Sequence, residues 1–302
     1  MSLLTVGTVA FDSIETPYGK AEQVIGGACT YASYAASYLI KPINLVSIVG
    51  ADFPPEELKA LEDRGVDLRG LAIKGNGRTF FWSGKYHDNM NKRDTLVTDL
   101  NVLDDFDPVL PNDYKSSKYV LLGNLTPEIQ EQVLNQLDGS QKLIALDTMN
   151  FWMDIAMEKL KEVIGKIDLL TINDEEARQL SGEYSLVKAA AKIHELGPKY
   201  LIIKKGENGA LLFSEGEIFF APALPLAEVF DPTGAGDTFA GGFMGYLAKS
   251  DDITFANMKK AIIYGSAMAS FCVEKFSIEK LKNLTAEEID DRLAKFKALT
   301  HY

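Results

Sequence analysis

The sequence predicts an α/β domain in which helices cover both faces of a mostly parallel central sheet, giving three layers, with a small β-sheet inserted as a lid. Short apolar runs of strand length alternate along the chain with amphipathic helical patterns. That alternation is typical of parallel strands joined by crossover helices. No repeat or low-complexity linker interrupts the chain, so we expect a single domain over residues 1–302.

The individual elements follow from these runs. The N-terminal residues "MSLLTVGTVAFD" read as a first strand, and five later apolar runs predict strands at 43–50, 118–123, 142–148, 168–173 and 199–206. Helical patterns occupy the intervals 127–136, 154–164, 186–196 and 238–248. The chain turns helical again after Thr254, and Thr285 with Glu288 form a capping box for a last helix. Sheets of this kind bind ligands beyond the carboxyl ends of their strands.

Residues 71–100 break the alternation. They are rich in β-forming, aromatic and polar residues without a helical pattern, and we expect them to form the inserted lid. Four basic or titratable side chains in it are interpreted as solvated lid residues: Lys85, His87, Lys92 and Arg93.

Composition excludes several classes of protein. A net charge of −12 argues against a nucleic-acid partner, because phosphate backbones are bound by clustered Lys and Arg. The two cysteines lie in apolar contexts and favour a reducing compartment. There is no basic leader at the N-terminus and no apolar stretch of roughly 18 residues, so we expect a cytoplasmic protein without a membrane span.

The residues "DPTGAGDTFAGGF", 231–243, are the most informative stretch. A glycine turn that opens a helix presents unpaired backbone N–H groups and the positive end of the helix dipole, and both suit a phosphate. Asp237 directly follows this turn, where a carboxylate would repel such an anion. A general base that deprotonates an attacking hydroxyl would be placed there. On spacing alone, an ordinary glycine turn with an acidic residue in the first helical turn fits equally well.

Two other glycine motifs do not fit. No G-x-x-x-x-G-K-[ST] sequence is present, and Phe239 stands where a G-x-G-x-x-G dinucleotide motif needs its third glycine. The thirteen residues instead closely resemble the C-terminal signature of the ribokinase-like (PfkB) carbohydrate kinases. The resemblance implies the ribokinase-like α/β/α fold, with Asp237 as catalytic base and the N–H groups of Gly234, Ala235 and Gly236 as the anion hole.

The resemblance also implies sites for cations and for the acceptor. Asp231 and Thr233 match positions that hold a monovalent cation, K⁺ being the candidate, in many members of the family. Asp12, and Gly26 and Gly27 of "VIGGACTYASYAASYL", match the positions that bind sugar hydroxyls. Read alone, Asp12 is a turn residue and the glycine pair serves helix packing. Tyr31 stands where the family usually carries an asparagine, which allows an aromatic stacking contact with the substrate instead.

Nucleotide and magnesium positions follow from the same resemblance. Asn173 and Glu176 match an N-x-x-E motif that orders magnesium-bound water, although the pair also reads as a helix cap. Gly206 and Gly209 border the nucleotide in the family but alone indicate only a hairpin.

Two further nucleotide contacts are expected by position. Either Lys204 or Lys205 would lie near phosphate, and the helix around Ser266 and Ser270 would complete the adenine pocket. Ser277 stands where the family often has a glycine near the cation loop.

The resulting hypothesis is an ATP- and Mg²⁺-dependent phosphotransferase that acts on a hydroxyl of a sugar. Related lids pair across a two-fold axis, so the resemblance also implies a homodimer through the lid. A nucleoside is the alternative acceptor, because Tyr31 and the aromatic lid suit a base. A non-catalytic sugar- or nucleotide-binding protein and a dinucleotide-dependent dehydrogenase are the alternatives from other classes.

Overall fold

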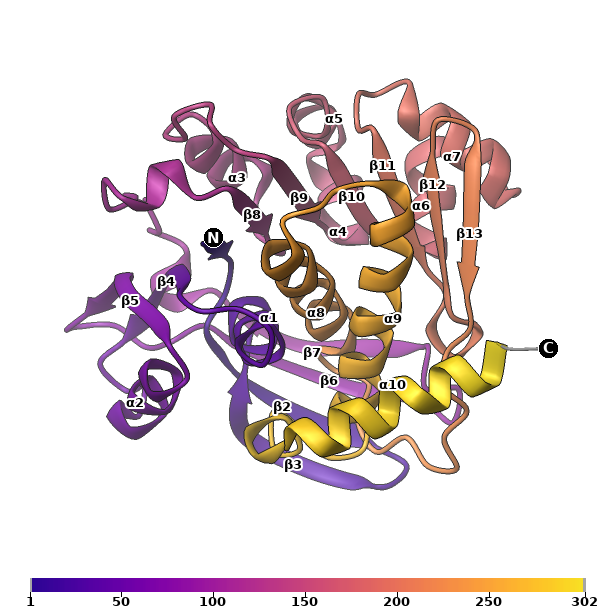
Figure 1. Ribbon diagram of the computed structural model, residues 1–302. Coiled ribbons are helices and arrows are strands. Elements are labelled where there is room, and N and C mark those ends of the chain that lie inside the picture. Colours follow the sequence, from indigo (N-terminus) through magenta and orange to yellow (C-terminus); the bar gives the residue numbers. More distant parts are fainter. Residues whose placement is uncertain (1, 301–302) are drawn as a thin grey trace.

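A large twisted sheet with helices on both faces dominates the computed structural model, which describes residues 2–300 (Figure 1). The sheet has nine strands in the order β13-β12-β11-β10-β9-β8-β1-β4-β5. All neighbours from β11 to β5 are parallel, whereas β12 and β13 add antiparallel at one edge. The strands are β1 (Leu3–Val6), β4 (Ile43–Gly50), β5 (Val66–Lys74), β8 (Tyr119–Leu122), β9 (Leu143–Asp147), β10 (Leu169–Asn173), β11 (Tyr200–Lys204), β12 (Ala210–Ser214) and β13 (Glu217–Ala221). The mostly parallel sheet predicted from the sequence is confirmed.

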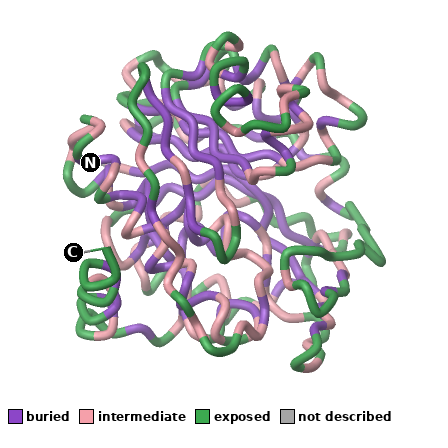
Figure 2. Tube along the Cα trace, turned by 90° about the vertical axis from the view of Figure 1, so that its right-hand side faces the viewer, coloured by how far each residue is buried: buried purple, intermediate pink, exposed green. Residues whose placement is uncertain are grey.

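Two hydrophobic cores lie on opposite faces of this sheet. Successive side chains of a strand point to opposite faces, so Leu3 joins one core and Leu4 the other. Helices α1, α8 and α9 cover the first core, and α3, α5, α6 and α7 cover the second (Figure 1). The helices are α1 (Ala28–Ser37), α2 (Pro55–Asp63), α3 (Pro127–Leu134), α4 (Asn150–Ile155), α5 (Met157–Ile164), α6 (Asp174–Ser181), α7 (Leu186–His194), α8 (Ala235–Ser250), α9 (Phe255–Cys272) and α10 (Ala286–Thr300). The central strands are accordingly buried along most of their length (Figure 2).

The helices predicted from periodicity agree with the structure except in one place. Residues 154–164 were expected to form one helix, but the chain forms α4 and α5 with a break at Ala156, whose φ is −141°. Periodicity continues across such a break because both helices bury the same core. The capping box of α10 is confirmed: the Glu288 amide donates to Thr285 Oγ1 (3.1 Å), and the Thr285 amide donates to Glu288 Oε2 (2.9 Å).

A second, smaller sheet packs below the large one, with strand order β3-β2-β6-β7 (Figure 1). Its strands are β2 (Ala10–Thr16), β3 (Gly19–Gly26), β6 (Phe81–Tyr86) and β7 (Arg93–Asp99). Residues 71–100 therefore supply only half of this sheet, and their first residues, up to Lys74, belong to β5. The hairpin at 10–26 escaped the sequence reading because its partner β6 lies about 70 residues away in the chain.

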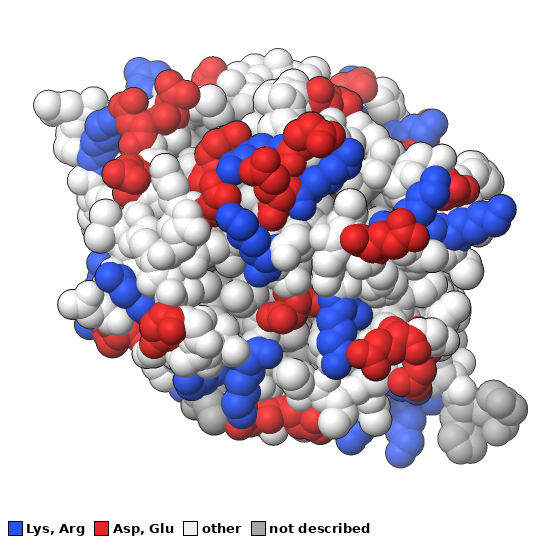
Figure 3. All heavy atoms as spheres, turned by 90° about the horizontal axis from the view of Figure 1, so that it is seen from above, with Lys and Arg blue, Asp and Glu red and all other residues white. Residues whose placement is uncertain are grey.

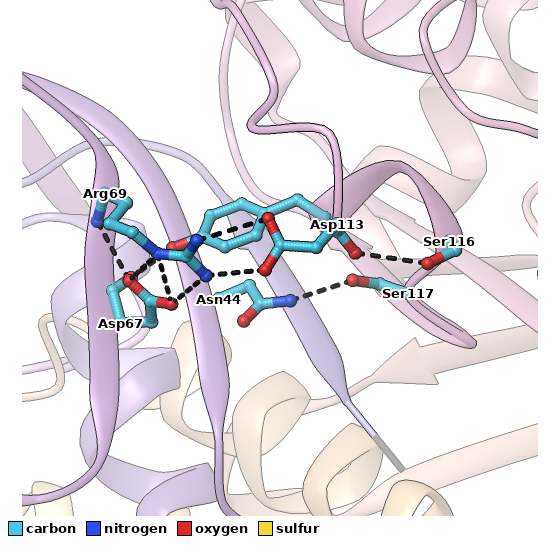
Figure 4. A network of polar contacts seen from close by, with 7 residues as sticks. Asn44, Asp67, Arg69, Asp113, Ser116 and Ser117 are labelled. Atoms are coloured by element: carbon cyan, nitrogen blue, oxygen red, sulfur yellow. Dashed lines mark hydrogen bonds and ion pairs between the residues drawn. The ribbon is translucent and has the colours of Figure 1, made fainter.

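A polar network joins the edge strand β5 to the segment that precedes β8 (Figure 4). The Arg69 guanidinium contacts both Asp67 (2.5 Å) and Asp113 (2.6 Å) and lies over the Tyr114 ring. The hydrogen bond from Arg69 lowers the pKa of Asp67 to about 2. These contacts hold the long connection after β7 against the large sheet.

Charged side chains of both signs are interspersed over the face seen in Figure 3. Within residues 2–300, no helix combines the length and the apolar character that crossing a membrane requires.

Candidate active site

The glycine turn lies at the start of α8 and packs closely on α1. Gly234 is the N-cap residue with φ of 73°, a left-handed conformation that favours glycine. A Cβ at Gly234 would lie 2.4 Å from the Tyr31 ring, and a Cβ at Gly236 would lie 3.2 Å from Lys204 Nζ. The Tyr31 contact and the left-handed conformation therefore require glycine at position 234, whereas a Cβ at position 236 would need only a small shift of the Lys204 side chain.

The turn leaves backbone donors free at the positive end of a 16-residue helix. The Ala235 amide donates to the Pro232 carbonyl (3.2 Å). Among the described residues, the amides of Gly234 and Gly236 have no backbone acceptor. Two of the three donors expected from the sequence are thus unpaired, while Ala235 closes the turn. This geometry is suited to an anion.

Asp237 lies one residue beyond the turn and has a strongly perturbed acidity. Burial and, to a smaller extent, the neighbouring Asp147 raise its pKa to about 7, while Lys204 and Arg93 act in the opposite direction. A carboxylate with a pKa near neutrality can accept a proton efficiently at physiological pH. The environment of Asp237 therefore suits a general base.

Lys204 is the lysine that lies at the turn. Lys204 is the last residue of β11, and Asp147 is the last residue of β9. The Lys204 ammonium forms an ion pair with Asp147 Oδ2 (2.6 Å). Burial alone would lower the pKa of Lys204, but Asp147, Glu176 and Asp237 outweigh it and the pKa is raised. Lys205 instead lies 5.8 Å from the Phe220 ring centroid. Of the two lysines that the sequence left open, Lys204 is thus the one beside Gly236, and its contact with phosphate stays a prediction.

Asp12 and the Gly26-Gly27 pair form one unit. A Cβ at Gly26 would lie 1.9 Å from Asp12 Oδ2, and Gly27 has a φ of 95° with the Thr8 carbonyl 2.5 Å from its Cβ position. Asp12 is 5% exposed, and burial together with the charges of Asp231 and Asp237 raises its pKa to about 8. The glycine pair therefore leaves room for a carboxylate that lies on the site-facing side of β2.

Tyr31 differs from the sequence expectation. Its side chain is 1% exposed and packs under Gly234, so it does not offer a ring face for stacking. Its hydroxyl has no hydrogen-bond partner among the described residues. Burial, together with Asp12 and Asp231, raises its pKa well above the usual value. The expected aromatic contact with substrate is thus corrected: Tyr31 supports the turn from below.

Asn173 and Glu176 form a capping box at the start of α6. The Glu176 amide donates to Asn173 Oδ1, and the Asn173 amide donates to Glu176 Oε2, both at 2.8 Å. Glu176 is 6% exposed, and burial raises its pKa to about 7, moderated by Lys204. The structural interpretation of this motif is confirmed. The same carboxylate lies at the carboxyl end of the sheet, near Lys204.

Asp231 connects the turn to the segment after α9. Its two oxygens accept from the amides of Thr233 (2.8 Å) and Ser277 (3.0 Å). Ser277 also donates its hydroxyl to the Ile25 carbonyl of β3. Thr233 Oγ1 donates to Tyr86 Oη (3.1 Å) on β6. The turn is thereby fastened to the small sheet at two points.

The remaining nucleotide candidates separate into two groups. Gly206 and Gly209 have φ of 53° and 83° and flank the turn between β11 and β12, and Gly206 lies against Asn91 at the tip of the small sheet. Ser266 is half-buried on α9. Ser270 instead contacts α10, because its hydroxyl donates to Ala267 O and accepts from Arg292, both at 2.7 Å. Ser270 therefore serves the α9–α10 contact.

Three residues in this region were not selected from the sequence. Asp147 ends a predicted strand, so its position beyond the sheet was a usable signal. Tyr86 and Arg93 come from the segment taken as a solvated lid, and Arg93 is among the charges that act on Asp12, Glu176 and Asp237. No local pattern marks these two residues, because β6 and β7 reach the turn only through tertiary packing.

Comparisons with known proteins agree with this geometry. The profile described as "pfkB family carbohydrate kinase" matches residues 2–282. The chain is 30% identical to the cytidine kinase of Thermococcus kodakarensis, over 81% of this chain and 87% of that protein. It is 27% identical to a nucleoside kinase of Methanothermobacter thermautotrophicus, over 90% of this chain and 89% of that one.

The fold also matches solved structures. Arabidopsis thaliana ribokinase, complexed with ribose and ATP, superposes with a TM-score of 0.76 at 22% identity, covering 96% of this chain and 98% of that chain. The large and small sheets described above are thus the ribokinase-like fold. From the match over nearly its whole length, we conclude that this chain belongs to the pfkB family of carbohydrate kinases.

Proposed function

We propose that this protein transfers the γ-phosphoryl group of ATP to a hydroxyl of a sugar ring, with Asp237 as general base. The observation that carries the proposal is the pairing of Asp237, whose pKa is raised to about 7, with a glycine turn in which the amides of Gly234 and Gly236 have no acceptor among the described residues. A base and an anion site side by side are what phosphoryl transfer to an alcohol requires.

Different groups of this chain have different roles in the proposed transfer. Asp237 takes the proton of the acceptor hydroxyl as the oxygen attacks phosphorus. The amides of Gly234 and Gly236 and the Lys204 ammonium, which lies beside Gly236, stabilise the charge on the transferring group. Asp12 accepts hydrogen bonds from other hydroxyls of the acceptor, which positions the ring. Gly206 and Gly209 border the nucleotide, and Ser266 lies toward the adenine.

The donor set fits Mg²⁺ held through water. Glu176 is a buried carboxylate beside the charged Lys204, and one of its oxygens, Oε1, accepts no hydrogen bond within the described residues. Mg²⁺ keeps several waters and is commonly held by few carboxylates plus phosphate oxygens, and it neutralises phosphate charge. Asp231 and Thr233 are the candidates for a monovalent cation, K⁺, beside the turn.

Two acceptors remain candidates. A free sugar has the hydroxyl groups that Asp12 and the glycine pair would bind. A nucleoside is favoured by the relatives, because a cytidine kinase and a nucleoside kinase match along most of the chain. Both acceptors present ring hydroxyls to Asp12, so the two differ in what lies beyond the sugar.

A coupled ATP-consumption screen over sugars and nucleosides tests the proposal. We expect acceptor-dependent ADP formation for at least one compound, and a loss of about 10²-fold or more in Asp237→Asn with that acceptor. Equal ATP consumption by the wild type and Asp237→Asn would refute the role of Asp237. Acceptor binding without ATP consumption would identify a non-catalytic binding protein, and NADH binding in a fluorescence titration would favour a dehydrogenase.

A further inference from the structure

We propose that Asn124, Phe151 and Trp152 form a base subsite, which binds a nucleobase attached to the sugar of the acceptor. The inference rests on the proposed function and names its substrate class, a nucleoside whose base carries a carbonyl oxygen. It follows from the strand ends at which these residues lie, from an exposed aromatic corner on α4 and from the fixed orientation of the Asn124 amide.

The base subsite begins at the point where the strand order of the large sheet reverses. From β1 the chain runs outward to β4 and β5 on one side and to β8 and its followers on the other, so ligands are expected between the ends of β1 and β8. Gly123 follows β8, and its amide donates to the Val6 carbonyl at the end of β1 (2.7 Å). Gly123 lines the same small cavity as Asp147 and Asp237. Asn124 is the next residue, so its side chain starts beside the candidate active site.

Asn124 lies on the acceptor side of the site and not on the nucleotide side. Gly206 and Gly209, the nucleotide candidates, follow β11, which is three strands beyond β8. Neighbouring strands are about 4.8 Å apart, so roughly 14 Å separates the two places along the edge of the sheet. Gly27 instead lies against the end of β1, because a Cβ at Gly27 would come 2.5 Å from the Thr8 carbonyl oxygen. The strand end that carries Asn124 is therefore the direct neighbour of the sugar position.

Helix α4 supplies an aromatic corner at this edge. Phe151 is 50% exposed, and its ring meets the Trp152 ring edge to face, with the centroids 4.9 Å apart and the planes at 71°. Two rings in this arrangement leave ring surface uncovered. Asn150 Nδ2 donates to Gln179 Oε1 (2.6 Å), which holds α4 on α6. The corner is thus a preformed surface on which a planar base can stack.

The orientation of the Asn124 amide is set by Trp152. The indole Nε1 donates to Asn124 Oδ1 (2.8 Å), and an indole nitrogen can only donate, so the NH₂ group of Asn124 points away from it. Asn124 Nδ2 lies 3.0 Å from Met149 Sδ, which is a weak acceptor. Asn124 is partly exposed, so this amide is accessible to a ligand. A ligand group bound here has to offer an acceptor, as a carbonyl oxygen does.

Charge favours a neutral ligand group. The side chains of the base subsite are uncharged, and the neighbouring charged residues of β9 and α4 are both acidic. Asp147 is paired with Lys204 (2.6 Å), and Asp154 accepts from Gln179 (2.6 Å). A phosphate or carboxylate would find no unpaired cation in this group of side chains. Cytosine, uracil and guanine are neutral and planar and carry carbonyl oxygens, and each is attached to the sugar that Asp12 would position.

The test measures binding by calorimetry without ATP. We expect wild-type protein to bind at least one of cytidine, uridine, inosine and guanosine about 10²-fold more tightly than free ribose, because stacking and one hydrogen bond are added. Phe151→Ala should weaken the binding of that nucleoside about ten-fold and leave the binding of ribose unchanged. Phe220→Ala is the matched control, since Phe220 is 51% exposed and lies on β13, and it should leave both affinities unchanged.

A second variant separates contact with the base from support of α4. Asn124→Asp keeps an oxygen for Trp152 Nε1 but replaces the donating NH₂ group with a second acceptor. We expect it to weaken nucleoside binding by about ten-fold or more, whereas a residue that only holds Trp152 would leave that affinity unchanged.

Three results overturn the inference: no nucleoside binds more tightly than ribose, Phe151→Ala binds the nucleoside within two-fold of wild type, or Asn124→Asp does so. The proposed function fails separately. A nucleoside that binds through the base subsite but causes no ATP consumption would refute the kinase and leave the base subsite in place. ATP consumption with free sugars alone would do the reverse.

Discussion

Replacing Asp237 with Asn should make the ligand-free protein more stable while it removes activity. The carboxylate is held in a region that disfavours its charge: burial raises its pKa from 3.8 to about 7, and Asp147 contributes in the same direction. Asn has nearly the same shape and carries no charge. The substitution therefore removes the cost of ionisation without removing packing.

The magnitude follows from linkage. Between pH values near the unfolded pKa of 3.8 and the folded value of about 7, the native state binds a proton that the unfolded state has lost. Stability therefore falls as the pH rises through this window, and the full cost is present above it. Roughly three pKa units correspond to about 4 kcal/mol at most. Asp237 keeps part of its surface exposed to solvent. Screening by that solvent reduces the expected gain in the free energy of unfolding of Asp237→Asn at pH 8 to about 1–3 kcal/mol.

Urea unfolding of both proteins at pH 8 and at pH 4.5 measures this gain. We expect Asp237→Asn to exceed the wild type at pH 8 and the difference to shrink toward zero at pH 4.5. Asp290→Asn, an exposed residue on α10, is the matched control and should show no pH-dependent difference. A variant that is equally stable or less stable than wild type at pH 8 would refute the electrostatic reasoning.

Three further outcomes are expected. Because the base must be ionised, kcat/KM should rise with pH through a midpoint near 7, the value to which burial raises the pKa of Asp237, and a profile flat from pH 5.5 to 8.5 would contradict this. Gly26→Ala places a Cβ 1.9 Å from Asp12 Oδ2, so steady-state kinetics should show the KM for the acceptor raised about ten-fold or more, with that for ATP unchanged. An unaltered acceptor KM would separate Asp12 from the substrate. Edge strand β7 exposes Leu96 and Val97, and we expect light scattering at micromolar concentration to give the mass of a dimer paired through the small sheet; a monomer would count against this pairing.

The fold was largely predictable because its signals are local. Each parallel strand is a short apolar run bounded by polar residues, as in "INLVSIVG", which forms β4. The helix break at Ala156 could not be predicted, since the core-facing pattern continues through it. The small sheet was only half found, because β2 and β6 pair across a long loop and neither strand carries information about the other.

The residues of the candidate site also fall into those that the sequence indicated and those whose position depends on packing. Asp237 and its glycines are adjacent in the chain, so the sequence showed a candidate anion site with a carboxylate beside it, although spacing alone fitted an ordinary glycine turn equally well. Tyr31 shows the opposite case: its residue type suggested a substrate contact, but the packing of α1 on α8 buries the ring under Gly234.

The sequence by itself determined the strand and helix periods, the glycine turn and the order of the polar residues that follow the strands, because each depends on neighbours within a few positions. Tertiary structure alone decided that Lys204 and not Lys205 lies at the turn, that Gly26 makes room for Asp12, and that Arg93 pairs with Tyr86 across β6 and β7. These relations depend on strand register and on the docking of one sheet on another. They arise from burial and pairing between segments far apart in the chain, and no local pattern encodes them.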